Sequence, residues 1–213
     1  MDESARGILA IFNNVAPGRD AEFDEWFQHE HLAERIAVPG FVLGRRYEAV
    51  AGDRRFFNYY LTQSPDVLTS QAYLDRVNAP TPLTRKVMSE AFRDMVRTVC
   101  RRALVRGTMR GAAAAILRFE QPVDIAALTA VVDGHLRDKS VTCGEIWTAV
   151  DTGLTASEEE RLRGGDRRVA ACLVIETLRN AEAERVAGSL AGRFAGASIG
   201  VFRLLCEVRP ARP

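Results

Sequence analysis

The sequence predicts an α+β protein made of two tandem βαββαβ units, residues 1–107 and 108–213, whose antiparallel sheets pack face to face as an α/β barrel. Strand-like and helical segments follow one another in the order β-α-β-β-α-β, and the second half of the chain repeats that order. Such a unit places both helices on one face of a four-stranded sheet, so the other face needs a cover. Two sheets of one chain can cover each other. Pairing of each half with another chain is the alternative.

Four strands and three helices are predicted in the first half. Short apolar runs rich in β-branched and aromatic residues indicate the strands, and apolar residues at helical spacing indicate the helices. Pro39-Gly40 ends the first helix, and Gly52-Asp53 forms a turn between two strands. The predicted strands are residues 7–15, 41–50, 55–63 and 94–106, and the predicted helices are 20–36, 64–77 and 83–92.

The second half has the same order with a weak helical signal in its middle. Residues 155–163 are predicted as a loop with one helical turn, and Glu158-Glu159-Glu160 as its solvated start. His135 is expected at a helix end rather than in a site. Because this half lacks the Glu-His pair of the first, we expect it to act mainly as lid and partner. Its predicted strands are residues 111–119, 141–150, 168–178 and 198–208, and its helices 124–137 and 181–194.

Composition argues against several classes of partner. Lys+Arg 29 and Asp+Glu 28 give a net charge of +1, whereas nucleic-acid-binding proteins carry a clear basic excess. No stretch approaches the roughly 18 apolar residues of a membrane span, and the first residues lack the basic start of a signal peptide. The four cysteines form no C-x-x-C pair and are predicted to be buried free thiols. We therefore expect a reduced, cytoplasmic protein without a nucleic-acid or membrane partner.

The stretch EWFQHEHLAERIAVPGFVLGRRYE, residues 25–48, holds two of the three histidines and one of the two tryptophans. On a regular helix, Trp26 belongs to an apolar stripe with two phenylalanines, Glu30 and Glu34 fall within that stripe, and His31 lies at its edge. Leu32 and Ile36 would lie nearly opposite. Either the helix bends near His31, or its outer face meets another element.

Two interpretations follow for the buried carboxylates. A carboxylate on the sheet-facing side of the helix needs a partner, because burying it unpaired costs several kcal/mol. In the structural interpretation, the carboxylates tie the helix to the next strand through arginines at positions 35, 45 and 46. In the functional one, His31 or Glu30 reaches a cavity and handles a proton. His29 and His31 are not at i,i+4 spacing, so a metal site is not predicted.

Strand residues supply further candidates for a pocket. Amides and phenols stand among apolar neighbours on the predicted strands, where they must be paired or line a cavity. Interface hydrogen bonds and aromatic packing are the alternative explanation. Trp147 is expected in the core or the barrel lining. The candidate substrate-binding residues are Trp26, Arg45, Tyr47, Asn13, Asn58 and Tyr60, beside the candidate catalytic residues His31 and Glu30.

The segment FDEWFQHEHLAERIAVPGFVLGRRYE resembles the EthD-like members of the dimeric α/β-barrel superfamily. The resemblance implies a ferredoxin-like fold. Relatives include cofactor-independent monooxygenases, lactone isomerases, polyketide cyclases and decarboxylases, and the histidine of their first helix corresponds to His31. Outside this segment only the order of elements is similar. The matching residues are Phe23, Trp26, Glu30, His31, Glu34, Arg35, Pro39, Gly40, Phe41, Arg45, Arg46 and Tyr47.

Two functional hypotheses remain open at this point. The first is an enzyme without a tightly bound cofactor or metal, acting on a small apolar or aromatic molecule with His31 as acid or base. The second is a non-catalytic module that binds a small molecule or serves association, in which Glu30, His31 and arginines form a structural network. An enzyme needs a cavity of about 300 Å³ or more beside His31. The chain is expected to form an internal pseudo-dimer, and homodimer formation stays open.

Overall fold

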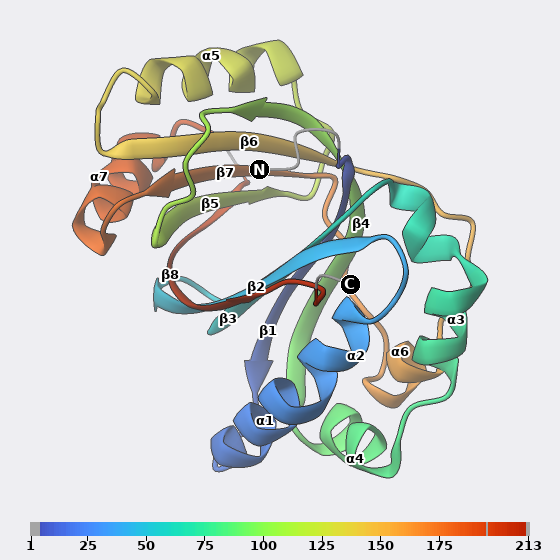
Figure 1. Cartoon of the computed structure of the whole chain (residues 1–213). Helices are drawn as coiled ribbons and strands as arrows, with labels where there is room; N and C mark the ends of the chain where they lie inside the picture. The colour runs from blue at the N-terminus through green and yellow to red at the C-terminus, as the bar shows by residue number, and fades with distance from the viewer. Residues whose placement is uncertain (1–4, 195, 212–213) are drawn as a thin grey trace.

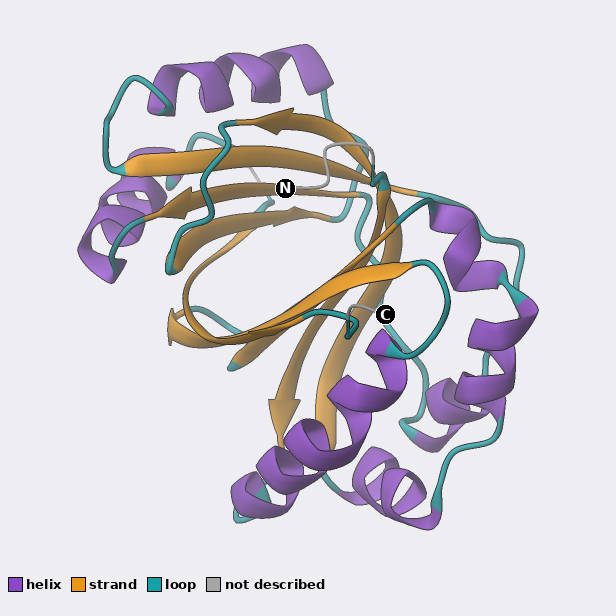
Figure 2. Ribbon diagram, in the orientation of Figure 1, coloured by secondary structure: helices purple, strands orange, loops and turns teal. Residues whose placement is uncertain are grey.

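The computed structural model describes residues 5–194 and 196–211. Eight antiparallel strands form one closed barrel, and helices cover it on two sides (Figures 1 and 2). The predicted α+β barrel is therefore confirmed, and it closes within one chain. The division into units 1–107 and 108–213 stays a prediction, because all eight strands share one barrel and residues 1–4 and 212–213 lie outside the described residues.

The strand order around the barrel is β1-β3-β2-β8-β5-β7-β6-β4. The first half contributes the run β4-β1-β3-β2, and the second half the same pattern, β8-β5-β7-β6. The two sheets meet where β2 pairs with β8 and where β4 pairs with β6, so no strand edge is left open. The strands are β1 (Gly7–Val15), β2 (Phe41–Ala51), β3 (Phe56–Thr62), β4 (Phe92–Arg106), β5 (Ala113–Phe119), β6 (Val141–Ala149), β7 (Ala171–Thr177) and β8 (Ser198–Val208).

The helices follow the predicted order with one correction. The predicted helix 64–77 is instead a 3₁₀ turn, Pro65–Thr69, followed by α3 (Gln71–Asn78), because Ser70 is extended and its hydroxyl accepts from the Tyr73 amide. The remaining helical elements are α1 (Asp20–Trp26), a π-helical turn (Phe27–His31), α2 (Leu32–Ile36), α4 (Pro82–Glu90), α5 (Ile125–His135), α6 (Glu158–Leu162) and α7 (Asn180–Leu190).

Three buried clusters divide the interior. Aromatic residues fill the barrel, where Phe57 stacks near Phe12, Tyr47, Tyr59 and Trp147. A second cluster lies between the first sheet and α1 to α4, and a third between the second sheet and helices α5 and α7. Each strand alternates between the barrel and a helix layer, as the period of two requires. Trp147 lies in the barrel lining, as predicted.

The connection between β6 and β7 crosses from one half to the other. It begins where the Val150 amide donates to the Val99 carbonyl on β4, and it returns where the Arg167 amide donates to the Met95 carbonyl. Between these anchors, α6 packs against α3 and α4 (Figure 1). Residues 150–168 of the second half, which we call the covering segment, thus cover the helix layer of the first half.

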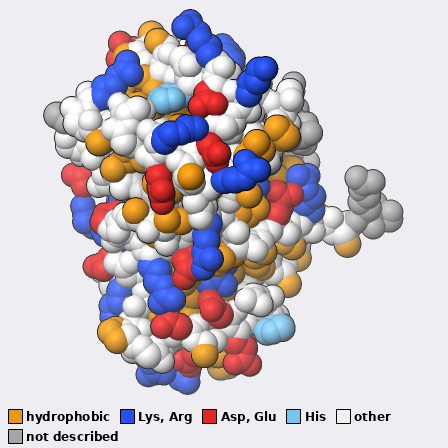
Figure 3. Space-filling view, turned by 90° about the vertical axis from the view of Figure 1, so that its left-hand side faces the viewer, with side chains coloured by type: hydrophobic (Ala, Val, Ile, Leu, Met, Phe, Trp, Pro, Cys, Tyr) orange, Lys and Arg blue, Asp and Glu red, His pale blue; other side chains and the backbone are white. Residues whose placement is uncertain are grey.

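The distribution of charged side chains and the state of the cysteines agree with the expectations from composition. Acidic and basic side chains are interspersed over the face seen in Figure 3, as expected for a net charge of +1. All four cysteines are free, and three are buried, whereas Cys206 is partly exposed. Among the described residues, no helix combines the length and the apolar character needed to cross a membrane.

Candidate functional site

A π-helical turn decides which residues of the first helix face the sheet. The Leu32 amide donates to the Phe27 carbonyl, five residues earlier, so one extra residue is inserted into the helix. The insertion rotates the following residues by about one position. His31, Leu32 and Ile36 therefore join Trp26 on the buried side. Of the two predicted explanations for Leu32 and Ile36, the structure supports a local change in the helix near His31.

The same turn moves both glutamates away from their predicted place. Glu30 and Glu34 are partly exposed rather than sheet-facing, so the predicted ties to strand arginines are wrong. Glu34 lies 3.5 Å from Arg76 of α3. Glu30 accepts hydrogen bonds at 2.5 Å from the hydroxyls of Thr81 and Thr84, at the start of α4.

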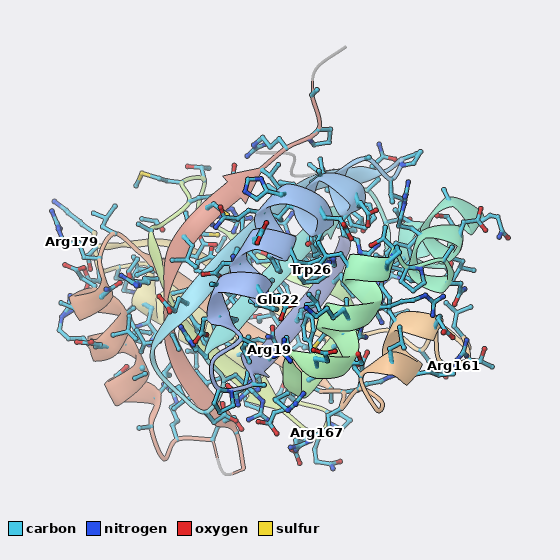
Figure 4. All side chains as sticks on the ribbon, turned by 90° about the horizontal axis from the view of Figure 1, so that it is seen from below. Arg19, Glu22, Trp26, Arg161, Arg167 and Arg179 are labelled. Carbon is cyan, nitrogen blue, oxygen red and sulfur yellow. The ribbon has the colours of Figure 1, made fainter. Side chains whose placement is uncertain are left out.

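Glu30 belongs to a network that fixes Trp26. The indole Nε1 of Trp26 donates to Thr84 Oγ1 at 2.9 Å, and that hydroxyl donates to Glu30. Figure 4 shows Trp26 between α1 and α4. Because the network anchors the indole, it also fixes the ring on which His31 packs, with centroids 4.4 Å apart. Glu30 is thus linked to His31 through Thr84 and Trp26.

His31 is buried and electrically neutral. Its side chain is 6% exposed, and Nδ1 has no hydrogen-bond partner among the described residues. Burial, followed by the charges of Arg35, Arg163 and Arg46, holds the pKa of His31 well below its usual value of 6.5. The imidazole is therefore unprotonated at neutral pH and can accept a proton.

A small cavity of about 20 Å³ lies beside His31, between the first sheet and its helices. A cavity of this size holds one or two waters. We call it the inner cavity. It is much smaller than the roughly 300 Å³ expected of a small-molecule site. It is lined by Leu9, Ile11, Phe27, His31, Arg35, Asn58, Tyr73, Met88, Phe92, Met95, Arg97, Glu159 and Arg163.

The covering segment contributes charge to this cavity. Glu159 of α6 accepts from Arg35 in a buried ion pair, and Arg163 lies 2.7 Å from Asp166 and 3.8 Å from Glu159. The predicted solvated start of this helix is therefore wrong for Glu159, which is 5% exposed. A buried carboxylate is tolerated here because two guanidinium groups face it.

Several polar atoms around His31 lack partners. The buried atoms Arg35 Nη1, Tyr60 Oη and Asn58 Oδ1 make no hydrogen bond among the described residues, as is also true of His31 Nδ1. Nearly all buried polar groups in proteins are paired, so these atoms need an explanation, as do Tyr47 Oη and Tyr59 Oη inside the barrel. A polar ligand or water in the inner cavity would supply partners.

The predicted site residues separate into two places. Trp26, His31, Asn58 and Tyr60 lie in the helix layer of the first half, with the Tyr60 ring 6.3 Å from His31. Asn13 is buried but does not line the inner cavity, and its amide donates to the neighbouring Asn14 carbonyl at 3.1 Å.

Arg45 and Tyr47 lie instead on the opposite face of the first sheet, inside the barrel. Arg45 donates to Glu176 at 2.9 Å and to the Gly111 carbonyl at 3.0 Å. Nearby, Arg102 binds Glu145 through two bonds of 3.0 and 2.8 Å. Burial raises the pKa of Glu145, but Arg110 and Arg102 outweigh that effect and hold the pKa below its usual range.

Sequence reasoning missed the residues that complete the inner cavity. Arg35 stands one helical turn after His31, and that spacing could have identified it. Arg97 and Tyr73 come from β4 and α3, and Glu159 and Arg163 from the second half, so no local pattern links them to His31. No group of three or more metal-ligating side chains occurs within residues 5–194 and 196–211.

Comparison with known proteins supports the fold. No family model and no curated protein matches the chain. An anthrone oxidase-like protein matches with a TM-score of 0.57 at 9% identity, covering 99% of this chain and 95% of that one. A candidate monooxygenase from Fusobacterium nucleatum also has a TM-score of 0.57, at 7% identity, with 96% and 95% covered.

A chlorite dismutase from Candidatus Nitrospira defluvii has a TM-score of 0.51 at 12% identity, with 94% of this chain and 92% of that one covered. At these identities the similarity concerns the fold. All three matches extend over nearly the whole chain, so each includes both halves of the eight-stranded barrel. The chain has the dimeric α/β-barrel fold, consistent with the EthD-like resemblance of its residues 23–47.

Proposed function

We propose that the protein is an enzyme that removes a proton from a small, mostly apolar molecule, with His31 as the base and no tightly bound cofactor. One observation carries the proposal. The imidazole of His31, whose Nδ1 has no partner among the described residues, lines a small cavity together with the guanidinium groups of Arg35, Arg97 and Arg163 and the carboxylate of Glu159.

The electrostatics suit formation of an anion. Arg35 and Arg163 make protonation of His31 less favourable, although the carboxylate of Glu159 in the cavity wall offsets part of their charge. A substrate that loses a proton becomes an anion, which the same cations stabilise, and that anion restores the basicity of His31. The positive charges of the arginines therefore favour proton transfer to His31 only when the substrate becomes an anion in the same step. Oxygenation, isomerisation and decarboxylation can each proceed through such an anion.

Aromatic ketones are a suitable substrate class to test. Trp26, Phe27 and Tyr60 surround His31 with aromatic surface, and the Tyr60 hydroxyl, unpaired among the described residues, can donate to a ketone oxygen. The name of one structural neighbour, an anthrone oxidase-like protein, agrees with an aromatic substrate. In this role Trp26, Tyr60 and Asn58 bind the substrate, and Glu30 positions Trp26.

The inner cavity must enlarge before it can hold such a molecule. Its volume of about 20 Å³ is too small for an aromatic ring. The covering segment supplies one wall through Glu159 and Arg163, and flexible Met88 and Met95 supply another. Movement of α6 away from Arg35 would open the cavity without disturbing the barrel.

A structural network is the second candidate. The same small volume, together with the buried Arg35–Glu159 ion pair across the two halves, favours it. In that case the polar residues around His31 join the covering segment to the first helix. No ligand would enter, and the protein would serve binding or association elsewhere.

Ligand-induced thermal stabilisation separates the two candidates. A ligand that binds the native state raises the melting temperature by mass action. We expect a hit among aromatic ketones, lactones or phenolic acids that stabilises the wild type and His29→Ala equally, but not His31→Ala. His29 is the matched control because it lies on the exposed side of the same helix.

Exchange of the acidic C–H of anthrone in D₂O then tests the chemistry. We expect the wild type to accelerate the exchange and His31→Ala to lose that acceleration. Equal exchange rates would exclude His31 as the base. An absence of hits, with a large stability loss in His31→Ala, would favour the structural network.

A further inference from the structure

A larger hollow adjoins the inner cavity. It is a groove of about 350 Å³ between α3, β4 and the covering segment, and we call it the outer groove. Its volume falls in the range of about 300–1,000 Å³ that is usual for small-molecule sites. The lining residues are Leu68, Tyr73, Leu74, Val77, Asn78, Arg97, Val99, Thr152, Leu154, Thr155, Ala156, Ser157, Glu160, Arg161 and Arg168.

Two residues form the wall between the hollows. Tyr73 and Arg97 line both the inner cavity and the outer groove. Arg97 Nη2 donates to Tyr73 Oη at 2.5 Å, so one side-chain pair separates the spaces. A rotamer change of Arg97 would join the outer groove to the cavity beside His31. The outer groove is thus the nearest route by which a ligand can reach His31.

Charge in the outer groove favours an anion. Three arginines face one carboxylate, that of Glu160. Arg161 is engaged by Glu158 at 3.1 Å and points outward from α6 (Figure 4). Arg168 lies 4.0 Å from Glu160, at the limit of an ion pair, and its side chain is 55% exposed. Arg168 and Arg97 therefore remain available to a ligand.

The rest of the groove combines apolar side chains with the polar side chains of Asn78, Thr152, Thr155 and Ser157. Leu68, Leu74, Val77, Val99 and Leu154 line it beside the arginines. A ligand that fits both kinds of surface carries an anionic group at one end and an apolar body at the other. Arginine recognises a carboxylate through two parallel hydrogen bonds, which fixes the orientation of the bound group.

We propose that the outer groove binds the carboxylate of the substrate through Arg168 and Arg97, while the aromatic body reaches His31. The substrate class is then an aromatic ketone that also carries a carboxylate, and a neutral ketone such as anthrone would bind more weakly. The inference rests on the proposed function for the position of the reacting atom. Because the covering segment supplies Arg168 and α6, the second half sets the specificity of a site whose base comes from the first half.

Phenylacetate and its methyl ester test this inference, because they differ in charge and share the aromatic body. Dissociation constants from titration calorimetry are compared for the wild type, Arg168→Gln and Arg167→Gln. Arg167 is the matched control, since it is adjacent, equally exposed and paired with Glu120 outside the outer groove. We expect Arg168→Gln to weaken phenylacetate binding roughly tenfold or more, and Arg167→Gln and the ester to show changes below about twofold.

Several outcomes would overturn the inference. Equal affinity for acid and ester, unchanged affinity in Arg168→Gln, or no binding of either probe at millimolar concentration would each do so. Fluorescence of Trp26, measured in a Trp147→Phe background, and the variant His31→Ala report separately on the proposed function. Binding that depends on Arg168 but leaves Trp26 fluorescence and His31→Ala unaffected would retain the outer groove and reject His31 as the base. Binding that needs His31 but has equal affinity for acid and ester would retain His31 as the base and reject the outer groove as the carboxylate site.

Discussion

The two helix layers of this molecule cover similar sheets but differ in what they bury. The second layer, under α5 and α7, is an apolar cluster of alanine, valine, leucine, isoleucine and phenylalanine. The buried hydroxyls of Thr142 and Thr177 in that half donate to backbone carbonyls at 3.1 and 2.9 Å. The first layer buries His31, Arg35 and Tyr60, each with an atom that lacks a partner.

The contrast separates stabilising packing from a candidate site. Unpaired buried polar atoms cost stability. Among the described residues the second layer has one, on Glu182, whereas the first layer has several around His31 and the barrel has others on Tyr47 and Tyr59, so packing for stability alone does not account for the first layer. The first layer is also the one covered by a segment from the other half, which brings Glu159 and Arg163. The expectation that the second half acts as lid and partner agrees with this arrangement.

The largest effect is expected where the covering segment is tied to the first layer. Arg35→Met leaves Glu159 buried with only Arg163 nearby, at 3.8 Å. We expect a loss of about 3–5 kcal/mol in the free energy of unfolding, measured in urea, because a buried charge loses its partner. The double variant Arg35→Met/Glu159→Leu should recover most of the loss. A double variant as unstable as the sum of the single variants would contradict this explanation.

The second-largest effect is expected in the stability losses caused by substitutions in the two helix layers. Leu128→Ala removes a fully buried side chain from the second layer and should cost about 2–5 kcal/mol. His31→Leu in the first layer should cost less than about 1 kcal/mol, or stabilise the protein, because leucine needs no partner for Nδ1. Both values come from urea denaturation. Comparable losses in the two variants would show that the first layer is also optimised for stability.

The sequence predicted the fold better than the site. Alternation placed Arg45 and Tyr47 on one face of their strand, as observed, but it does not tell which face points into the barrel. The π-helical turn at residues 27–31 has no sequence signal, because one inserted residue leaves the composition of the helix unchanged. A regular helix therefore placed Glu30 and Glu34 where His31 and Arg35 are found.

Contacts between distant segments were beyond local patterns. Glu159 meets Arg35 across 124 residues of sequence. Three consecutive glutamates usually indicate a solvated helix face, and only the path of the covering segment buries the middle one. His31 and Trp26 were identified because their types are rare in this chain and their spacing resembles a known motif.

The pH dependence of stability should distinguish His31 from a surface histidine. Its folded-state pKa is well below 6.5, so below pH 6.5 the unfolded chain binds a proton that the folded chain does not. Stability therefore falls as the pH drops from 6.5 toward the folded-state pKa, by at most about 1.4 kcal/mol per pH unit. His31→Gln should remove this loss and match the wild-type pH dependence above neutral pH.

His135 offers the control for that measurement. Burial, followed by the charge of Arg193, also lowers the pKa of His135, but this residue is partly exposed at the end of α5. His135→Gln should therefore change the acid sensitivity less than His31→Gln does. Unfolding in urea at a series of pH values checks both variants. An unchanged acid sensitivity in His31→Gln would mean that the folded-state pKa of His31 lies near its ordinary value.

The smallest effect concerns the network that holds Trp26. Thr84→Val keeps the shape of the side chain but removes the hydroxyl between the indole and Glu30. We expect a loss of about 1 kcal/mol and a shift in Trp26 fluorescence, because the indole loses its hydrogen bond.

In the second layer, Thr129→Val removes a hydroxyl that donates only to the Ile125 carbonyl of its own helix, at 2.8 Å. That variant should change stability by less than about 0.5 kcal/mol and leave the fluorescence unchanged. A stability loss in Thr84→Val without a fluorescence shift would mean that packing alone fixes the indole, so Glu30 would have no part in positioning His31.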